Sequence, residues 1–301
     1  MALEPDLLIE RRRLKRQLGF WRGALLLGVV AVAALFTADV ASPGALSASH
    51  VARLPINGFI GDEPRLLREI ERAAKEPSVR ALIVSIDSPG GSVAGGEGLH
   101  GAIQRLRATG KPVVAVMGGT AASAGYMVAL PAERVFAREA TLTGSIGVIL
   151  QSFDASELIA RLGLRPETLT SGPLKDQPSP FRPLSEEGRA ALQAVIADMH
   201  AQFVAKVVQG RGMEEARVRA LADGRVMTGR QALGAGLVDA IGGEPEARAW
   251  LAEAHGVSAD LRVEELDARS RAERVLSRAA AGVWQAGLEA LRAHGFGGLP
   301  Q

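Results

Sequence analysis

The sequence predicts an α/β fold, a mainly parallel sheet with one membrane-spanning helix before it and a helical continuation after it. Short apolar runs alternate with stretches of helical periodicity, which is typical of βαβ units. Hydrophobic residues make up 47% and charged residues 23% of the 301 residues, enough apolar side chains for a core. A basic cluster followed by an uncharged apolar run predicts the membrane helix.

The first half of the core alternates regularly. Residues 79–87, "VRALIVSID", are apolar almost throughout, as a strand buried in a parallel sheet requires. The helix that follows ends at Gly110, a residue that often terminates helices. In this half we expect strands at 51–60, 79–87, 111–118 and 133–137, and helices at 63–76 and 93–110.

The second half is predicted to become helical. Ser185 followed by two acidic residues is typical of a helix amino terminus, and the long helix from it runs to Gly212. Before it we expect strands at 145–150 and 166–171 and a short helix at 154–163. The sequence shows no internal repeat, so a single α/β domain is the simplest interpretation.

The amino terminus carries the strongest signal of location. Six arginines and lysines between Arg11 and Arg22 precede residues 23–38, which hold no charge. These 16 residues span roughly 24 Å as a helix, slightly short of a hydrocarbon core of about 30 Å. Trp21 and Arg22 can extend the span by lying in the headgroup region.

The predicted organisation follows from that anchor. Residues 1–22 form a cytoplasmic basic segment, 23–38 the transmembrane anchor, 39–50 a linker, 51–262 the α/β domain and 263–301 a helical tail. The positive cluster keeps the amino end inside, so the domain is expected outside the cytoplasmic membrane. A cleaved signal peptide is the alternative, with "ALS" at 45–47 as a distant cleavage match, and a buried soluble helix fits badly with the one-sided basic flank.

Composition excludes several classes of function. A net charge of +2 and 4% aromatic residues give no basic patch or stacking platform for nucleic acid. The absence of cysteine excludes disulfides, thiol catalysis and cysteine-ligated metals. Chemistry must therefore come from other side chains.

Two loops carry chemical signals. In "SIDSPGGSV", residues 85–93, a buried strand ends at two glycines before a helix, which suits an oxyanion hole, although a tight turn has the same composition. In "GGTAASAGYMVALPA", residues 118–132, Ser123 stands among small residues between a strand and a helix. Open α/β sheets hold their sites at such strand ends, but a serine there can also be only a helix cap.

A reactive serine needs a base, and the histidines are poor candidates because none lies in a predicted strand-end loop. The five are His50, His100, His200, His255 and His294. Lysine is the other established base for serine. Lys175 follows a predicted strand in the proline-rich segment "LTSGPLKDQPSPFRPLSEE", where an ordinary surface lysine is the plain alternative.

Five blocks in order carry a family resemblance. They are "IDSPGG", "GGTAASAGYMVALPAERVFA", "TLTGSIGV", "SGPLKD" and "DGRVMTGRQALGAGLVDAIGG", within residues 51–262. The sequence resembles signal peptide peptidase A, a serine–lysine peptidase family with a fold similar to Clp protease and the crotonases. The resemblance implies a core of repeated ββα and βαβ units.

The resemblance also implies roles for individual residues. Ser123 falls on the nucleophile, Lys175 on the base and Ser145 on the serine that orients the base. The oxyanion hole falls on the N–H groups of Gly91, with Gly90 its neighbour, and of Ala124. A lysine base must be neutral near pH 7 to 8, so Lys175 is expected to be desolvated in the assembled enzyme. No metal or cofactor is needed.

Substrate, location and assembly are implied in the same way. We expect a membrane-anchored endopeptidase that degrades released signal peptides in an extended conformation, with its domain on the outer face of the cytoplasmic membrane. Double-length members carry two such domains, so this chain is expected to form a homo-oligomer of eight subunits whose neighbours share the Ser/Lys site. A crotonase-type acyl-CoA enzyme and a catalytically silent membrane scaffold are the alternatives. The tail at 263–301 could lie on the membrane, cover a neighbour or be solvated.

Overall fold

The computed structural model describes residues 48–266 as one continuous segment. A few residues of the amino-terminal region are also described: Lys15, Leu18, Gly19, Trp21–Gly23 and Leu26. They belong to a separate compact unit from the segment 48–267. Most of the predicted anchor at 23–38, and the predicted tail beyond 266, lie outside the described residues. Among the described residues, no helix has the length and apolar character needed to cross a membrane.

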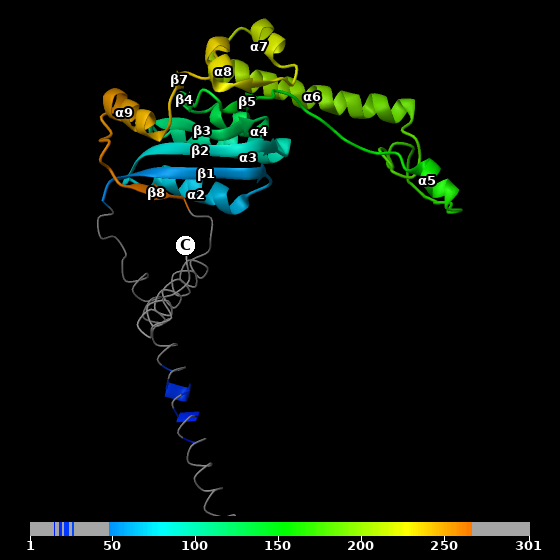
Figure 1. Cartoon of the computed structure of the whole chain (residues 1–301), viewed down its shortest axis with the longest axis horizontal. Coiled ribbons are helices and arrows are strands. Elements are labelled where there is room, and N and C mark those ends of the chain that lie inside the picture. The colour runs from blue at the N-terminus through cyan, green and yellow to red at the C-terminus, as the bar shows by residue number, and fades with distance from the viewer. Residues whose placement is uncertain (1–14, 16–17, 20, 24–25, 27–47, 267–301) are drawn as a thin grey trace, which may run out of the picture. The chain divides into compact units, whose positions relative to one another are not determined.

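A single sheet of eight strands organises the described segment (Figure 1). Its order is β6-β5-β3-β2-β1-β8, and β4 and β7 branch from β3. All pairs are parallel except β5 with β6, which confirms the predicted α/β class. The strands are β1 His50–Ile60, β2 Val79–Gly91, β3 Val113–Ala122, β4 Arg134–Ala137, β5 Leu142–Gly144, β6 Val226–Thr228, β7 Ala240–Ile241 and β8 Val263–Glu265.

Strand β3 is the branch point of the sheet. Its residues 114–116 pair with β4, and its last residues, 120–122, pair with β5 instead. The chain therefore leaves β3 at a place where the sheet has just changed partners. This arrangement puts the carboxyl ends of β2, β3 and β5 together at one edge, where open α/β sheets hold their sites.

Helices cover the two faces of the sheet unequally. Helix α3 packs with both α2 and α4, and α3 and α4 pack against β2, with α4 also against β3. On the other face Ala247 and Leu251 of α9 pack with Val51, Ile83 and Val114 near the amino ends of the strands. The helices are α2 Pro64–Lys75, α3 Val93–Arg107, α4 Ala124–Ala129, α5 Ser156–Arg161, α6 Glu186–Arg211, α7 Glu215–Leu221, α8 Gly229–Ala235 and α9 Glu244–His255.

The carboxyl half of the α9 face lacks a cover within the described part of the chain. Asn57, Phe59, Asp87 and Pro89 all lie there and are exposed, with Phe59 75% accessible. Parallel sheets are normally covered on both faces. Within the described residues this half of the sheet departs from that pattern.

Two predicted strands are wrong. Residues 145–150 form no strand and pair with no described strand, because β5 pairs through Leu142–Gly144, just upstream. Residues 166–171 also form no strand. Apolar residues with β propensity predicted both, but a strand needs a partner edge, and the described chain offers none there. Conversely, β2 and β3 run on to Gly91 and Ala122, four residues beyond their predicted ends.

The carboxyl boundary also differs from the prediction. Val263–Glu265 form β8, which pairs parallel with β1 at Val51–Arg53. The segment assigned to a helical tail from residue 263 therefore begins with an edge strand of the sheet.

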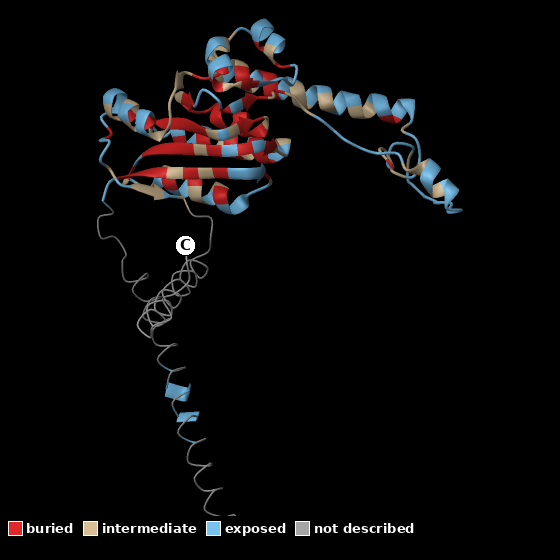
Figure 2. Ribbon diagram, viewed as in Figure 1, coloured by how far each residue is buried: buried red, intermediate tan, exposed pale blue. Residues whose placement is uncertain are grey.

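The segment between β5 and α6 stands away from the sheet (Figure 1). We call residues 149–184 the arm; it contains α5 and is closed on itself by a hydrogen bond from Ala155 N to Pro180 O of 2.8 Å. Much of it is exposed (Figure 2). Its exposed large apolar side chains are Ile149, Leu150, Phe153, Leu158, Leu162, Leu164, Leu169, Leu174 and Phe181. Such a density of uncovered apolar side chains is typical of a surface that docks elsewhere.

The long helix α6 joins the arm to the core. At its carboxyl end Arg211 donates to both carboxylate oxygens of Asp239, at 2.9 and 2.6 Å, and to the carbonyl of Gly236 at 3.0 Å. Arg211 is almost fully buried there. A bidentate, buried pair of this kind fixes orientation as well as distance. The end of α6 is thus fastened to the core, while its beginning projects with the arm.

Candidate active site

Ser123 lies between β3 and α4, at the carboxyl edge of the sheet. Its N–H donates to the carbonyl of Gly144 in β5 at 2.9 Å, and its carbonyl accepts from Met127 N in α4 at 3.0 Å. Tyr126 fastens α4 to the core, because its hydroxyl donates to the carbonyl of Leu237 at 2.8 Å. Burial raises the pKa of Tyr126, so it remains a protonated donor. The strand and helix on either side of Ser123 are therefore fixed independently.

The backbone of Ser123 is strained. Its φ of 54° and ψ of −122° lie in a region that residues with a side chain rarely adopt. Ser145, with φ of 50°, is the other non-glycine residue of the described chain with a positive φ. Backbone strain concentrates where function requires an unusual orientation. Both strained residues are serines that the sequence had singled out.

Two glycines bring the carboxyl end of β2 against Ser123, and we call Gly90 and Gly91 the glycine loop. Gly90 has a φ of 118°, and a Cβ placed on it would lie 2.9 Å from Ser123 Cβ and 3.3 Å from its Oγ. A Cβ on Gly91 would lie 2.0 Å from the carbonyl oxygen of Ile60. Neither position can hold a side chain without displacing its neighbour. The close approach of this loop to the serine thus depends on the two glycines.

Ser145 reaches the same site from the end of β5. Its N–H donates to the carbonyl of Arg225 at 2.8 Å, which holds it beside β6. The preceding Gly144, at φ 78°, turns the chain there. The structure therefore brings together Ser123, Ser145, Gly90 and Gly91, and places Ala124 as the first residue of α4 behind the serine.

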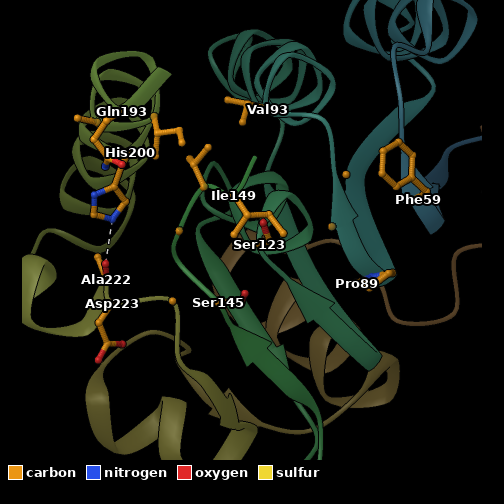
Figure 3. Close-up of a pocket in the computed structure, with 17 residues that line it drawn as sticks. Phe59, Pro89, Val93, Ser123, Ser145, Ile149, Gln193, His200, Ala222 and Asp223 are labelled. Carbon is orange, nitrogen blue, oxygen red and sulfur yellow. Dashed lines mark hydrogen bonds between the residues drawn. The ribbon is translucent and has the colours of Figure 1, made fainter. Parts of the chain in front are cut away.

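These groups open into one cavity of about 780 Å³ (Figure 3). Its walls are mainly apolar, with Phe59, Val93 and Ile149 among them, and Ser123, Ser145 and the glycine loop at its base. Residues 147–149, which follow β5, also line it. Such a lining favours an apolar ligand that is oriented by a few polar groups.

The far wall holds two residues that the sequence did not single out as site residues. His200 of α6 and Asp223 lie across the cavity from Ser123 (Figure 3). The His200 Nε2 lies 2.9 Å from the carbonyl oxygen of Ala222, so this nitrogen carries the proton. The hydrogen bonds from Arg225 lower the pKa of Asp223 to about 2, so it is ionised at neutral pH. Neither residue was predictable, because only the packing of α6 brings His200 to this wall.

Lys175 is not in this cavity. It lies in a turn of the arm, is exposed, and its N–H donates to the carbonyl of Gly172 at 3.2 Å. Within the described residues its ammonium group has no hydrogen-bond or ion-pair partner. The desolvation expected of a lysine base is therefore absent in the single chain. The fold supplies Ser123 and its surroundings, but not the predicted base beside it.

The site shows no metal-binding arrangement. Across the part of the chain that the structure describes, His, Asp and Glu side chains nowhere gather in groups of three that could hold an ion. The arrangement instead suits nucleophilic attack by a hydroxyl beside backbone N–H donors.

Comparison with known proteins places the chain among peptidases. The profile of "Peptidase family S49" matches residues 105–258, which include Ser123, Ser145 and Lys175 but not the glycine loop. A putative protease of Synechocystis is 38% identical over 212 residues, 70% of this chain and 76% of that protein. A putative signal peptide peptidase of Enterococcus faecium is 32% identical over 65% of this chain and 61% of its own length. Protease 4 of Salmonella typhi is 35% identical over 62% of this chain and 30% of its length.

The contact between Gly90 and Ser123 yields a direct test. In Gly90→Ala the new Cβ would press on Ser123, and alanine at this φ costs roughly 1–3 kcal/mol. We expect the rate at which a fluorophosphonate probe labels Ser123 to fall at least about tenfold, consistent with the sensitivity of such sites to small displacements. Gly234→Ala is the matched control, because nothing lies within 4 Å of a Cβ there, in α8. Wild-type labelling of Gly90→Ala would contradict the proposed packing.

Proposed function

The chain belongs to peptidase family S49 and is a serine peptidase, and from this premise we propose that Ser123 is its nucleophile and Lys175 of a neighbouring subunit its base. The resemblance to signal peptide peptidase A is confirmed at the level of the family. Family membership argues against the acyl-CoA enzyme and the silent scaffold that the sequence had left open. The observation that carries the proposal is the strained turn at Ser123, facing a cavity beside a glycine loop.

The proposed reaction is amide hydrolysis through an acyl-enzyme. The Ser123 Oγ attacks the scissile carbonyl as its proton passes to the amine of Lys175, and that proton then goes to the leaving amine. Water hydrolyses the ester in a second step. The negative oxygen of each tetrahedral intermediate is bound by the N–H of Ala124, the first of α4, and the N–H of Gly91.

Gly91 suits this role better than Gly90. The Gly90 N–H already donates to Ser88 Oγ at 3.1 Å, so it is engaged within the chain. Gly90 contributes instead by lacking a Cβ, which lets the loop approach Ser123. We therefore assign the oxyanion hole to Gly91 and Ala124.

The base is proposed to come from a second copy of the chain. A lysine can act as a base near neutral pH only when its amine is uncharged, and removal from water favours that form. Lys175, however, is exposed and lies outside the cavity of its own chain. The arm that carries it exposes apolar side chains such as Leu169, 91% accessible, and no residue between 48 and 266 covers the sheet face around Phe59. Docking the arm on a neighbour would cover apolar surface and carry Lys175 toward a Ser123. Ser145 is then placed to orient its amine.

The substrate is proposed to bind as an added strand. In the described chain, the backbone N–H and C=O groups of residues 146–149 have no backbone partner, and residues 147–149 line the cavity. An extended peptide can satisfy such an edge and place alternate side chains in apolar pockets. Signal-peptide remnants, which are apolar, fit this description. The relative from Enterococcus faecium is named as a putative signal peptide peptidase.

Location and fold family complete the proposal. The basic cluster before residue 23 and the uncharged run to residue 38 support a retained anchor, with the amino end inside and the peptidase domain outside the cytoplasmic membrane. The branched parallel sheet with its serine at the end of β3 supports a fold like that of Clp protease and the crotonases. Eight subunits in a ring is the assembly we propose.

Catalysis by Ser123 and Lys175 is tested with the full-length protein. A fluorophosphonate probe should label the wild type and not Ser123→Ala, and peptide cleavage should rise through mildly alkaline pH as the lysine base loses its proton. Lys175→Arg should be folded but inactive, because a guanidinium cannot act as a base at this pH. Near-normal turnover by Lys175→Arg would remove Lys175 from the mechanism, and loss of activity only in His200→Gln would make His200 the base.

Sharing of the site between subunits is tested by complementation. Ser123→Ala and Lys175→Ala should each be inactive alone, but mixing dissociated subunits of both should restore part of the peptidase activity, since some neighbours then unite an intact Ser123 with an intact Lys175. Different affinity tags on the two variants verify that mixed rings form. If mixed rings form and remain inactive, both groups act within one chain.

The anchor is tested by fractionation. The full-length protein should sediment with membranes, and protease added outside the cytoplasmic membrane should reach residues 40–301 while residues 1–22 stay protected. A substitution of two central apolar residues of the 23–38 run by aspartate should release the protein, because each charge disfavours insertion by about 2.5–3.5 kcal/mol. Recovery of a soluble mature chain that begins near Ser47 would instead establish a cleaved signal peptide.

A further inference from the structure

Ser88 is a buried hydroxyl residue beside the active site. It lies in β2, two residues before Gly90, and is 0% accessible. It does not line the cavity that contains Ser123, so it does not meet a substrate bound there. Its hydroxyl nevertheless makes contacts that a mere space-filling residue would not need.

The hydroxyl joins two loops. Ser88 Oγ donates to the carbonyl oxygen of Gly58 in β1 at 2.6 Å and accepts from the N–H of Gly90 at 3.1 Å. The Gly90 carbonyl lies 3.3 Å from the same oxygen. Because the hydroxyl has one hydrogen and the Gly58 carbonyl is the nearer acceptor, this single group connects the end of β1 to the N–H of Gly90.

The other end of the glycine loop is fastened to the same strand. The N–H of Ser92 donates to the carbonyl of Ile60 at 2.8 Å, and the Ser92 hydroxyl caps α3 by accepting from Gly95 N at 3.0 Å. Gly91 therefore lies between two fixed points, the Ser88–Gly58 bond and the Ser92–Ile60 bond. Since the backbone dihedral angles of glycine are weakly restricted, these bonds determine how its peptide group is oriented.

Ser88 also touches the helix that follows the nucleophile. A Cβ on Gly125 would lie 3.0 Å from the Ser88 carbonyl oxygen and 3.4 Å from its Cβ, so α4 packs directly on this residue. The glycine loop and the helix after Ser123 must act together on one carbonyl group, and both contact Ser88.

We propose that Ser88 is a positioning residue for the peptidase reaction: its hydroxyl holds the Pro89–Gly90 peptide by accepting from the Gly90 N–H, and so directs the following Gly91 N–H toward the oxyanion. The inference rests on the proposed roles of Ser123 and Gly91. Without the hydroxyl, the Gly58 carbonyl and the Gly90 N–H lose their hydrogen-bond partner. The Pro89–Gly90 peptide is then free to rotate toward another acceptor for its N–H. Rotation there misdirects the next N–H, which belongs to Gly91.

The test variant is Ser88→Ala, which removes one oxygen and leaves the size nearly unchanged. Thr141→Val is the matched control. Thr141 is 2% accessible, and its hydroxyl donates to the Gly118 carbonyl at 2.7 Å and accepts from Arg138 N at 3.0 Å. Both variants thus delete a buried hydroxyl with one donated and one accepted backbone bond, but only Ser88 contacts the glycine loop. Should Ser88→Ala fail to assemble, Ser88→Cys replaces it, since a thiol is a much weaker donor.

The expected result separates kcat from KM. Ser88→Ala should lower kcat for a fluorogenic peptide about 10- to 100-fold, up to the loss seen when an oxyanion donor is removed, with KM within about twofold of wild type. Affinity for a peptide boronic acid, which forms a tetrahedral adduct, should fall by about the same factor as kcat/KM. The alkaline rise of activity should keep its midpoint, because the base is untouched. Thr141→Val should keep wild-type kcat despite a similar fall in Tm.

Any of three results of the peptide-cleavage kinetics would overturn the proposal: a kcat for Ser88→Ala within twofold of wild type, an equal loss of kcat in Thr141→Val, or a change confined to KM. Failure of the proposed function is visible separately, because the wild-type protein would then not react with the fluorophosphonate probe at Ser123. If the probe labels the wild type and Ser88→Ala at equal rates, the nucleophile stands and the role of Ser88 falls.

Discussion

The rest of the site depends on the path of the main chain through Ser123. A residue with a side chain occupies a backbone conformation there that costs on the order of 1–3 kcal/mol. The cost is offset because strand β3 and helix α4 are each fixed elsewhere, by pairing with β2, β4 and β5 and by the buried hydrogen bond from Tyr126 to Leu237. The turn between them has no freedom to relax. The serine at this turn therefore faces the cavity.

That single turn explains the residues around it. Gly90 must lack a side chain because its Cα faces Ser123, and Gly125 must lack one because α4 packs on Ser88. The carbonyl of Gly144 accepts from the Ser123 N–H and so holds the turn. Gly144, which ends β5, and Ser145 both have positive φ, so Ser145 is strained as well. Glycines and alanines in these loops are thus consequences of bringing three strand ends within reach of one hydroxyl.

Sequence could predict the parts that local pattern determines. The strand around Ile83, the helix after Ser185 and the position of Ser123 between strand and helix all follow from periodicity and capping. Features that depend on contacts between distant segments could not be predicted. Residues 145–150 have the composition of a strand but no described strand to pair with. His200 reaches the cavity because Arg211 fixes α6 on the core. The edge strand at Val263 was missed because three residues carry too little pattern. The predicted roles of Ser123, Lys175, Ser145, Gly91 and Ala124 stay predictions that the geometry supports unequally.

The unequal support has a physical logic. Everything that must be precise to a fraction of an ångström, the serine turn and the glycine loop, is built on buried strands of one chain. In the proposed assembly the lysine is delivered by the arm, whose exposed apolar side chains would be covered by another subunit. Since Lys175 of the same chain is exposed and lies outside the cavity, a lone chain would hold a formed pocket and glycine loop but no lysine beside Ser123. Hydrolysis would then begin only when the same apolar contacts that close the assembly also remove Lys175 from water, which couples activity to assembly without a separate regulatory element.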